Sequence, residues 1–391
     1  MLDTKFPSWP SFTLEEAEAV HRVLLSNRVN YWTGEECRNF ENEFAEWIGV
    51  PHAVSLNNGT VALEMAVRAL GIRPGDEVIV TPRSFLASTS CIVSAGAVPI
   101  FADVCRDTQN LTAETIARVL TPRTRMIIPV HLAGMPCDMD PIVDLANAHG
   151  LAIIEDCAQA HGARYKDRHV GSIGDIGAWS FCQDKIMTTA GEGGMITTRN
   201  HALWSAIWSA KDHGKSWTAV YAQPKTHGFR WVHESFGTNG RMLEVQAVVG
   251  RIQLRRMADW THARRRNAGH IWNAARRITG LRAPEIPGWA QHGAYKAYVF
   301  IEPGALKSSW SRDRIVAEIN DCGVPCYTGS CSEVYLEKAF DGTGWRPPNR
   351  LPVARELGDT SLMFLVHPTL NDQNIEHTCE ALERVMSQAV I

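Results

Sequence analysis

Short apolar runs alternate along the first part of the chain with segments in which apolar residues recur every third or fourth position. The runs predict buried strands, and the recurring pattern predicts helices with one apolar face. The expected strands cover 52–58, 77–82, 99–103, 126–131, 151–156, 176–181 and 194–198. The expected helices cover 14–26, 36–49, 61–70, 85–96, 112–120, 139–149 and 202–212. Such alternation favours an α/β fold with a mostly parallel sheet wrapped by helices.

The pattern changes in the last third of the chain. A long helical segment over 242–278 places Val245, Val248 and Ile252 on one side, where it can connect a large domain to a smaller one. Beyond it, a strand at 298–302 and helices at 313–320 and 371–386 predict a smaller α+β unit. We therefore predict a large domain over 1–255 with N-terminal helices, and a C-terminal domain over 256–391 that completes the substrate cleft.

Composition narrows the class of protein. The 391 residues are 45% hydrophobic and 21% charged, as in an ordinary globular protein, and a net charge of -3 gives no reason to expect nucleic acid or an acidic membrane as partner. No apolar run reaches the length of a membrane span and the first residues show no secretory signal, so we expect a cytoplasmic protein. The ten cysteines form no CxxC pair, which predicts reduced, mostly buried thiols and no metal site.

Candidate chemistry centres on Lys185 and Asp156. Lys185 follows an apolar strand and precedes a glycine-rich turn, which suits an amine that is held still and forms a Schiff base. Asp156 ends a buried strand, and ligands of open α/β sheets bind beyond such strand ends. An acid and a lysine converging there point to pyridoxal phosphate, whose pyridine nitrogen the acid keeps protonated. The alternative is a solvated surface lysine.

A second candidate lies at Gly59 and Thr60, where a short strand gives way to a helix. Free N–H groups at a helix N-terminus bind anions, so this junction suits a phosphate. The alternative is a simple N-cap formed by Thr60.

These features, taken in order, resemble the DegT-type sugar aminotransferases, a branch of the aspartate-aminotransferase fold. The shared motifs include Asn-Gly-Thr at 58–60, Thr-Pro at 81–82, Pro-Val-His-Leu-Ala-Gly at 129–134, Asp-Met-Asp at 138–140, Glu-Asp-Cys-Ala-Gln-Ala-His-Gly at 155–162, Ser-Phe at 180–181, Lys185, Gly-Glu-Gly-Gly at 191–194 and Asn-Gly-Arg-Met at 239–242. The match covers about 33–250 and weakens onward to 382. The resemblance implies pyridoxal phosphate as cofactor, fold type I and a seven-stranded-type sheet.

The resemblance also implies residue roles. Lys185 would carry the cofactor and then move a proton as base and acid, and Asp156 would pair with the pyridine nitrogen. Gly59, Thr60 and Ser180 would bind the phosphate. Asn239 would reach the phosphate of the neighbouring subunit's cofactor, which implies a homodimer with shared sites.

Two further roles have open alternatives. Gln159 would bond the cofactor's phenolic oxygen, or else be a surface residue. Phe85 would stack on the cofactor ring, or else belong to the core.

The chain departs from the family over 324–333, where a His-Tyr-x-Pro-like segment near the sugar is common. The small and hydroxyl-bearing residues from Cys326 to Glu333 include Gly329, so this loop is able to bind a carboxylate or sugar hydroxyls, or is only a surface turn leading to a helix at 335–338. Arg83 is a candidate counter-charge for a carboxylate or a phosphate.

The predicted function is transfer of an amino group, with glutamate as donor, to a keto-sugar for bacterial surface polysaccharide or lipopolysaccharide. The acceptor is a nucleotide-linked keto-deoxysugar or a free sugar acid such as 8-oxo-Kdo, which would give 8-amino-Kdo. One alternative is a pyridoxal-phosphate-dependent sugar dehydratase, a branch in which histidine replaces the lysine, so Lys185 disfavours it. The other is a non-catalytic regulatory protein that retains the fold, which Asp156 and Lys185 also disfavour.

Overall fold

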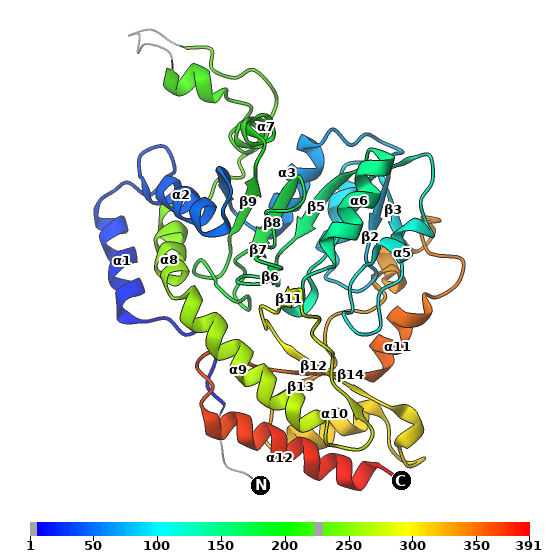
Figure 1. Cartoon of the computed structure of the whole chain (residues 1–391). Coiled ribbons are helices and arrows are strands. Elements are labelled where there is room, and N and C mark those ends of the chain that lie inside the picture. Colours follow the sequence, from blue (N-terminus) through cyan, green and yellow to red (C-terminus); the bar gives the residue numbers. More distant parts are fainter. Residues whose placement is uncertain (1–5, 223–229) are drawn as a thin grey trace.

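The computed structural model describes residues 6–222 and 230–391. Residues 1–5, on which the expected lack of a secretory signal partly depends, and 223–229 of the expected loop after residue 212 lie outside this description. Figure 1 shows a large region built around one sheet, with a smaller region below it and helices α8 (Glu244–Arg255) and α9 (Met257–Ala275) running from one to the other. The C-terminus and Phe6, the first described residue, both lie at the smaller region.

Seven strands form the central sheet, in the order β1-β9-β8-β5-β4-β2-β3. Their bounds are β1 (His52–Leu56), β2 (Glu77–Val80), β3 (Val98–Phe101), β4 (Thr124–Ile128), β5 (Ala152–Asp156), β8 (Ile176–Ser180) and β9 (Gly194–Thr198). Strand β9 pairs antiparallel with both β1 and β8, whereas the pairs among β8, β5, β4, β2 and β3 are parallel. The sheet therefore confirms the predicted mostly parallel α/β architecture.

Helices cover both faces of this sheet because its strands are apolar on both sides. Val78 and Val80 of β2 belong to one core and Ile79, which points to the opposite face, belongs to another. The first core includes α2 (Glu36–Ile48) and α3 (Gly59–Ala69), and the second includes α6 (Met139–His149) and the short α5 (Ala113–Ala117). Helices α1 (Leu14–Leu25), α4 (Ala87–Ser94) and α7 (His201–Lys211) complete the large region.

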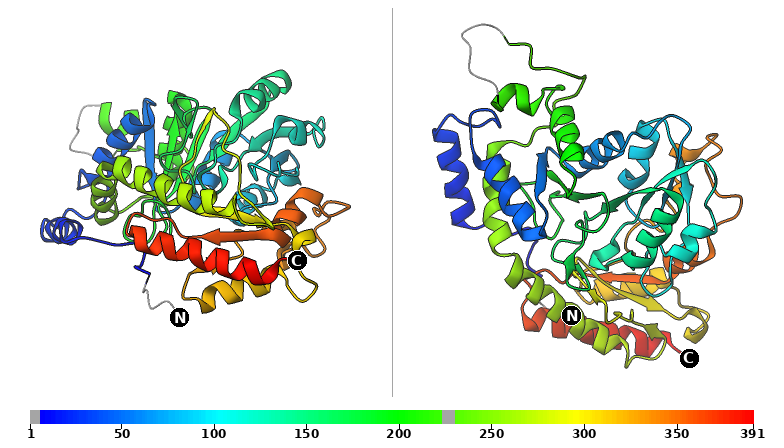
Figure 2. Two further views of the ribbon diagram at one scale, coloured as in Figure 1. Left: turned by 60° about the horizontal axis from the view of Figure 1, so that its bottom comes forward. Right: turned by 45° about the horizontal axis from the view of Figure 1, so that its top comes forward.

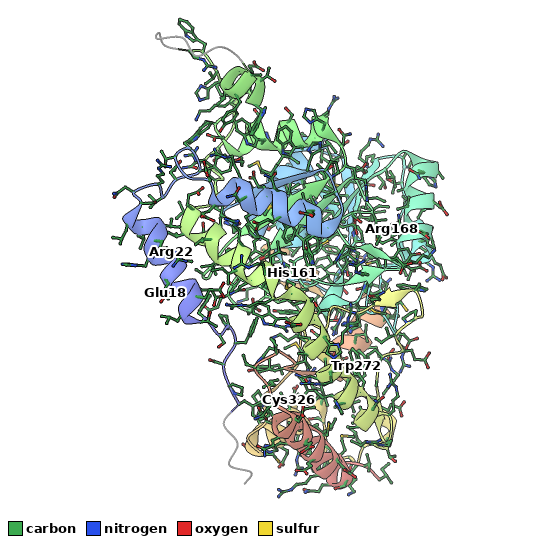
Figure 3. All side chains as sticks on the ribbon, turned by 60° about the vertical axis from the view of Figure 1, so that its left-hand side comes forward. Glu18, Arg22, His161, Arg168, Trp272 and Cys326 are labelled. Atoms are coloured by element: carbon green, nitrogen blue, oxygen red, sulfur yellow. The ribbon has the colours of Figure 1, made fainter. Side chains whose placement is uncertain are left out.

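The smaller region has a core of its own beside a four-stranded sheet. The sheet order is β10 (Leu281–Arg282), β12 (Ala297–Ile301), β14 (Ser361–Phe364) and β13 (Cys326–Tyr327), with antiparallel pairs throughout. Trp272 of α9, labelled in Figure 3, donates its indole N–H to the carbonyl of Tyr298 at 3.0 Å and so connects α9 to β12. Figure 2 shows α9 beside α12 (Asp372–Ala389); α10 (Arg312–Asp321) and α11 (Pro352–Thr360) complete this region.

Several predicted elements differ from the structure. The helix expected over 242–278 is divided at Arg256, whose guanidinium is held by Glu15 and Glu16 of α1. The helix expected at 335–338 is instead two 3-10 turns, Val334–Leu336 and Lys338–Phe340. A small sheet of β11 (Ala290–Gln291), β6 (Arg164–Tyr165) and β7 (Arg168–His169) was not predicted, because two-residue strands leave no periodic pattern.

Two expectations drawn from composition have structural outcomes. Among the described residues, no helix combines the length and the apolar character that a bilayer-crossing helix needs. All ten cysteines are free thiols, as predicted, although only Cys37, Cys91, Cys137, Cys157 and Cys326 are buried. The domain boundary at 255/256 stays a prediction.

Candidate active site

A cavity of about 1290 Å³ opens beyond the ends of the central parallel strands and continues to the smaller region. Such an edge of an α/β sheet is a common position for a ligand site. Most of the predicted site residues line it, namely Gly59, Thr60, Phe85, Asp156, Gln159, Ser180 and Lys185. The small region contributes Lys296, Tyr327, Gly329, Ser330, Cys331 and His367, and the N-terminal segment contributes Phe6 to Trp9.

Lys185 lies in the loop between β8 and β9, with its side chain 15% exposed. Its Nζ lies 5.4 Å from the centre of the Tyr295 ring and 3.9 Å from Oδ1 of Asp184. Its main-chain carbonyl accepts a hydrogen bond from the indole N–H of Trp9 at 2.7 Å. The surface-lysine alternative is therefore wrong: this amine is sheltered and faces the cavity.

Asp156 is buried at the end of β5. Its Oδ2 accepts the Ser88 hydroxyl at 2.8 Å, and its Oδ1 accepts the N–H of Ala158 at 3.1 Å. Burial raises the pKa of Asp156, against the opposing effect of these two hydrogen bonds and of the charge on Lys185. A cation next to this carboxylate would stabilise its charged form, which suits the partner of a protonated ring nitrogen.

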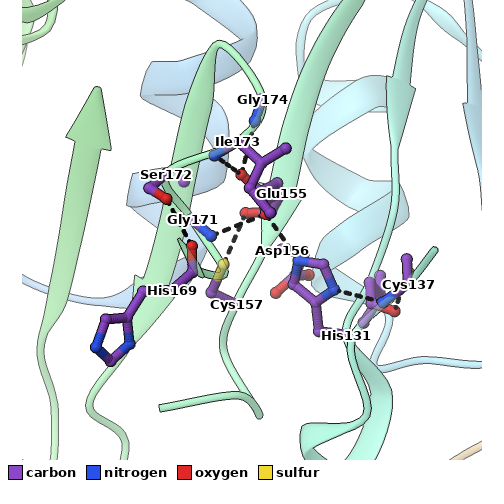
Figure 4. A network of polar contacts seen from close by, with 12 residues as sticks. His131, Cys137, Glu155, Asp156, Cys157, His169, Gly171, Ser172, Ile173 and Gly174 are labelled. Carbon is purple, nitrogen blue, oxygen red and sulfur yellow. Dashed lines mark hydrogen bonds and ion pairs between the residues drawn. The ribbon is translucent and has the colours of Figure 1, made fainter. Parts of the chain in front are cut away.

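The fully buried side chains of His131 and Glu155 form a hydrogen-bonded network next to Asp156 (Figure 4). Nε2 of His131 and Oε2 of Glu155 are 3.0 Å apart, and the N–H of Cys137 donates to Nδ1 of His131 at 3.0 Å, which leaves the ring proton on Nε2. Glu155 also accepts three main-chain N–H groups, from Gly171, Ile173 and Gly174, at 2.7–2.8 Å. Burial raises the pKa of Glu155, but the hydrogen bond from His131 and the main-chain N–H donors together lower it below its ordinary value.

This network was missed at the level of sequence and does not form a metal centre. Ligand atoms of His131, Glu155 and Cys157 lie within 4.8 Å of one another. However, both Glu155 oxygens already accept hydrogen bonds, and both nitrogens of the His131 ring are engaged. The main-chain N–H of His131 donates to the main-chain carbonyl of Asp156 at 3.1 Å. The network therefore helps to hold the end of β5, which carries Asp156.

An anion-binding terminus lies at the start of α3. Asn58 caps the helix by accepting the N–H of Val61 at 2.9 Å, so the alternative in which Thr60 is the N-cap is wrong. Gly59 and Thr60 open the helix, and N–H groups in this position have no earlier carbonyl in the helix to bind. A Cβ on Gly59 would come within 2.6 Å of Cβ of Ser180, so glycine lets that serine approach. Gly59, Thr60 and Ser180 all line the cavity, so this junction suits an anion bound there.

The alternatives for Gln159 and Phe85 are also decided. Gln159 is 7% exposed, so it is no surface residue, and its Oε1 accepts the N–H of Ala133 at 2.8 Å. This contact leaves the amide NH₂ as a donor to the cavity. Phe85 is 70% exposed at the cavity wall, so the core alternative is wrong and a ring face is open for stacking.

Arg83 does not line the cavity, and the proposed counter-charge role is wrong. Its side chain is fully buried and donates to Gln109 at 2.9 and 3.1 Å and to the hydroxyl of Ser361 at 2.8 Å.

Asn239 is absent from the cavity wall of this chain and pairs with Asp212 in a β-bridge. Its role toward a second subunit stays a prediction.

Loop 326–333 is no plain surface turn. Tyr327, Gly329, Ser330 and Cys331 line the cavity, and Gly329 has φ +92°, a left-handed conformation that favours glycine. A Cβ there would come within 2.4 Å of the Tyr298 ring.

Other cavity residues, namely Trp9, Asp184, Tyr295, Lys296 and His367, were not expected. Of these residues, only Lys296 could have been proposed from the sequence, because it directly precedes an apolar strand.

Comparison with known proteins agrees with this geometry. Residues 10–383 match the model of the DegT/DnrJ/EryC1/StrS aminotransferase family. The solved structure of an aminotransferase from Psychrobacter cryohalolentis is 59% identical, with a TM-score of 0.96 and coverage of 98% of this chain and 99% of that one.

Two curated relatives are similar over most of their length. The dTDP-3-amino-3,4,6-trideoxy-alpha-D-glucose transaminase of Streptomyces venezuelae is 37% identical over 94% of this chain and 91% of its own. The spore coat polysaccharide biosynthesis protein SpsC of Bacillus subtilis is 33% identical over 98% and 97%. The chain therefore belongs to the DegT/DnrJ/EryC1/StrS aminotransferase family and is a pyridoxal-phosphate-dependent sugar aminotransferase.

Proposed function

We propose that this enzyme transfers the amino group of glutamate to a keto-sugar, with Lys185 and Asp156 as its catalytic residues. The observation that carries the proposal is the convergence of a sheltered amine, a buried carboxylate and the N-terminus of α3 on one cavity. An amine alone has many uses. An amine facing a buried acid, with an anion site beside both, suits an aromatic phosphate that carries a cationic ring nitrogen.

The residues present fit pyridoxal phosphate. Gly59, Thr60 and Ser180 would hold its phosphate through N–H groups and hydroxyls, and Asp156 would pair with its ring nitrogen. The NH₂ of Gln159 is free to donate to the phenolic oxygen, and Phe85 is exposed for stacking on the ring. When bound, the cofactor supplies the electron sink that amino transfer needs.

Lys185 has two tasks in this proposal. Its amine would hold the cofactor, and after the donor displaces it the same amine would carry a proton from the donor's Cα to the cofactor's carbon. Trp9 holds the main chain of Lys185 in place, which would restrict how far the freed amine can move. The cavity also shelters this amine from bulk water, since its side chain is only 15% exposed.

A nucleotide-linked keto-deoxysugar is the acceptor that we favour. The relative from Streptomyces venezuelae is named for a dTDP-linked sugar, which supports this choice. A free sugar acid such as 8-oxo-Kdo loses one supporting argument, because Arg83 is buried against Gln109 and Ser361. The hydroxyl-bearing loop 326–333 at the cavity still suits either acceptor.

We further propose a cytoplasmic homodimer that serves the synthesis of a bacterial surface polysaccharide or lipopolysaccharide. The similarity to a spore coat polysaccharide biosynthesis protein supports the pathway class. Asn239 would then complete the partner's phosphate site.

An acceptor panel tests the proposal. The purified enzyme, loaded with pyridoxal phosphate, is incubated with glutamate and either nucleotide-linked ketohexoses or the free keto-sugar acid, and 2-oxoglutarate and the amino sugar are both quantified. We expect turnover of at least one nucleotide-linked ketohexose. Turnover of the sugar acid alone would replace the favoured acceptor, and no release of 2-oxoglutarate with any acceptor would refute glutamate as donor.

A further inference from the structure

The cavity contains few positive charges for a site that must receive anionic substrates. Among the described residues that line it, the basic side chains are Lys185, Lys296 and His367. Burial, and then the charges of Arg264 and Lys296, lower the pKa of His367 to about 3, so this imidazole is neutral at pH 7. Under the proposed function Lys185 is occupied by the cofactor. Lys296 is then the remaining cation among the described residues of the cavity wall.

Lys296 lies close to the reacting lysine. It directly precedes β12 and is half-buried, with Nζ 4.8 Å from the centre of the Tyr295 ring. Nζ of Lys185 lies 5.4 Å from the centre of the same ring. Within the described part of the chain, no hydrogen bond or ion pair engages the Lys296 amine. Asp184 is the carboxylate whose charge raises the pKa of Lys296, and it already accepts a hydrogen bond from the Tyr295 hydroxyl.

A second positive charge supports the same corner of the cavity. Arg264 is fully buried, and its guanidinium lies 4.8 Å from the centre of the Trp9 ring and donates to the carbonyl of Tyr295 at 3.3 Å. Trp9 and Tyr295 both line the cavity, so Arg264 lies directly behind this wall. Its Nε and Nη2 have no hydrogen-bond partner among the described residues, and no described ion pair neutralises it.

Three charged neighbours act on Lys296. Burial first, then the charge of Arg264, lower its pKa to about 8; Lys185 acts in the same direction and Asp184 in the opposite one. Lys296 in turn contributes to the lowered pKa of His367. Asp184 is thus the one carboxylate among these three neighbours and it also acts on Lys185, so an anion bound in this corner would stabilise the charged form of Lys296.

We propose that Lys296 binds an anionic group of a substrate, and that this group is a carboxylate of the amino donor. The inference rests on the proposed function, because it assigns Lys185 to the cofactor. The donor is favoured because its carboxylates lie close to the amine that reacts at Lys185, and the two lysines share the Tyr295 ring. In a nucleotide-linked acceptor the diphosphate is attached at C1, two or three ring bonds from a keto carbon at C3 or C4.

Separate half-reactions test this inference. Lys296→Met removes the charge and keeps the length of the side chain, Lys296→Arg keeps the charge, and Lys307→Met is the control because Lys307 is exposed and outside the cavity wall. Each variant is loaded with pyridoxal phosphate, and its absorption band is compared with that of the unmodified enzyme before use. Glutamate is then titrated without acceptor, and the keto-sugar is titrated into the aminated enzyme.

For Lys296→Met we expect the half-saturating glutamate concentration to rise roughly 10- to 100-fold, since a hydrogen bond to a charged group is lost. Lys296→Arg should recover part of the affinity, and Lys307→Met should be unchanged. A loss confined to the keto-sugar step would overturn the carboxylate assignment in favour of the acceptor's phosphates. Normal titrations in both steps would overturn the whole proposal.

A readout without turnover separates this inference from the proposed function. Acetic anhydride is applied to the enzyme with and without glutarate, a dicarboxylate that has no amino group to transfer, and acetylation of Lys296 is quantified by peptide mass spectrometry. We expect glutarate to slow acetylation of Lys296 and not of Lys307. Protection of Lys296 in an enzyme that proves inert toward glutamate would refute the proposed donor and keep the anion site; equal acetylation with and without glutarate would refute the site.

Discussion

The indole N–H of Trp9 donates a hydrogen bond to the main-chain carbonyl of Lys185 across 2.7 Å, although 176 positions separate the two residues. Trp9 also stacks on His367 and meets Trp260 edge to face, with ring centres 5.8 and 5.0 Å apart. The N-terminal segment thus links the loop of the reacting lysine to the smaller region. The position of Lys185 depends on residues at both ends of the chain.

We predict that Trp9→Phe keeps most of this ring packing but loosens the lysine loop. Loss of one hydrogen bond should lower the free energy of unfolding by about 1 kcal/mol, and amide hydrogen exchange over 182–190 should quicken. Urea unfolding and exchange mass spectrometry measure the two effects. Unchanged exchange in this loop would show that the indole N–H does not restrain it.

Asp156→Asn should separate activity from stability. The carboxylate is buried and its pKa is raised, so removing the charge should not destabilise the enzyme without cofactor. Turnover should fall by roughly two orders of magnitude, because losing an electrostatic partner of this kind costs about 3 kcal/mol. Steady-state kinetics and the melting temperature of the cofactor-free protein check both statements. Near-normal kinetics would mean that another group keeps the ring protonated.

Glu155→Gln should destabilise the fold by roughly 3 kcal/mol at pH 7, because it disrupts a buried, charge-assisted network with His131 and three N–H donors. The folded pKa of Glu155 lies below its ordinary value of 4.5. Its stabilisation is therefore fully present above that pH and is lost as the pH falls through the folded pKa.

Urea unfolding at pH 7 and pH 4 measures this dependence. The Glu155→Gln variant should lose less stability between the two pH values than the unmodified enzyme does. Glu356→Gln is the control, because Glu356 is a partly exposed partner of Arg106 outside this network. Equal losses in all three proteins would contradict the role given to Glu155.

A shared site predicts complementation between two inactive variants. Mixing Lys185→Ala subunits with Asn239→Ala subunits should form hybrid dimers in which one site is doubly damaged and the other is unmutated. Activity should then rise above that of either variant alone, as measured after subunit exchange is verified by native mass spectrometry. Verified exchange without any recovery of activity would count against a composite site.

The central sheet was predictable because its strands are buried on both faces and leave long apolar runs. The two-residue strands β6, β7, β10, β11 and β13 were not, since they are defined by their partners. Lys185 and Asp156 could be predicted as neighbours at one site because both follow apolar runs. Arg83 was misjudged because nothing local shows that Gln109 and Ser361 enclose it. Lys296, the Trp9 contact and the Glu155 network depend on residues that are distant in sequence and meet only in the fold.

The central claim is that Lys185 is the amine that holds the cofactor. The direct test is reduction of the enzyme loaded with pyridoxal phosphate by sodium borohydride, followed by digestion and peptide mass spectrometry to locate the pyridoxyl group. Lys296 is the informative competitor, because it is the other lysine among the described residues of the same cavity wall. We predict one pyridoxyl group per chain, on Lys185, and none in Lys185→Ala. A group found on Lys296, or no stable adduct on either lysine, would contradict the account.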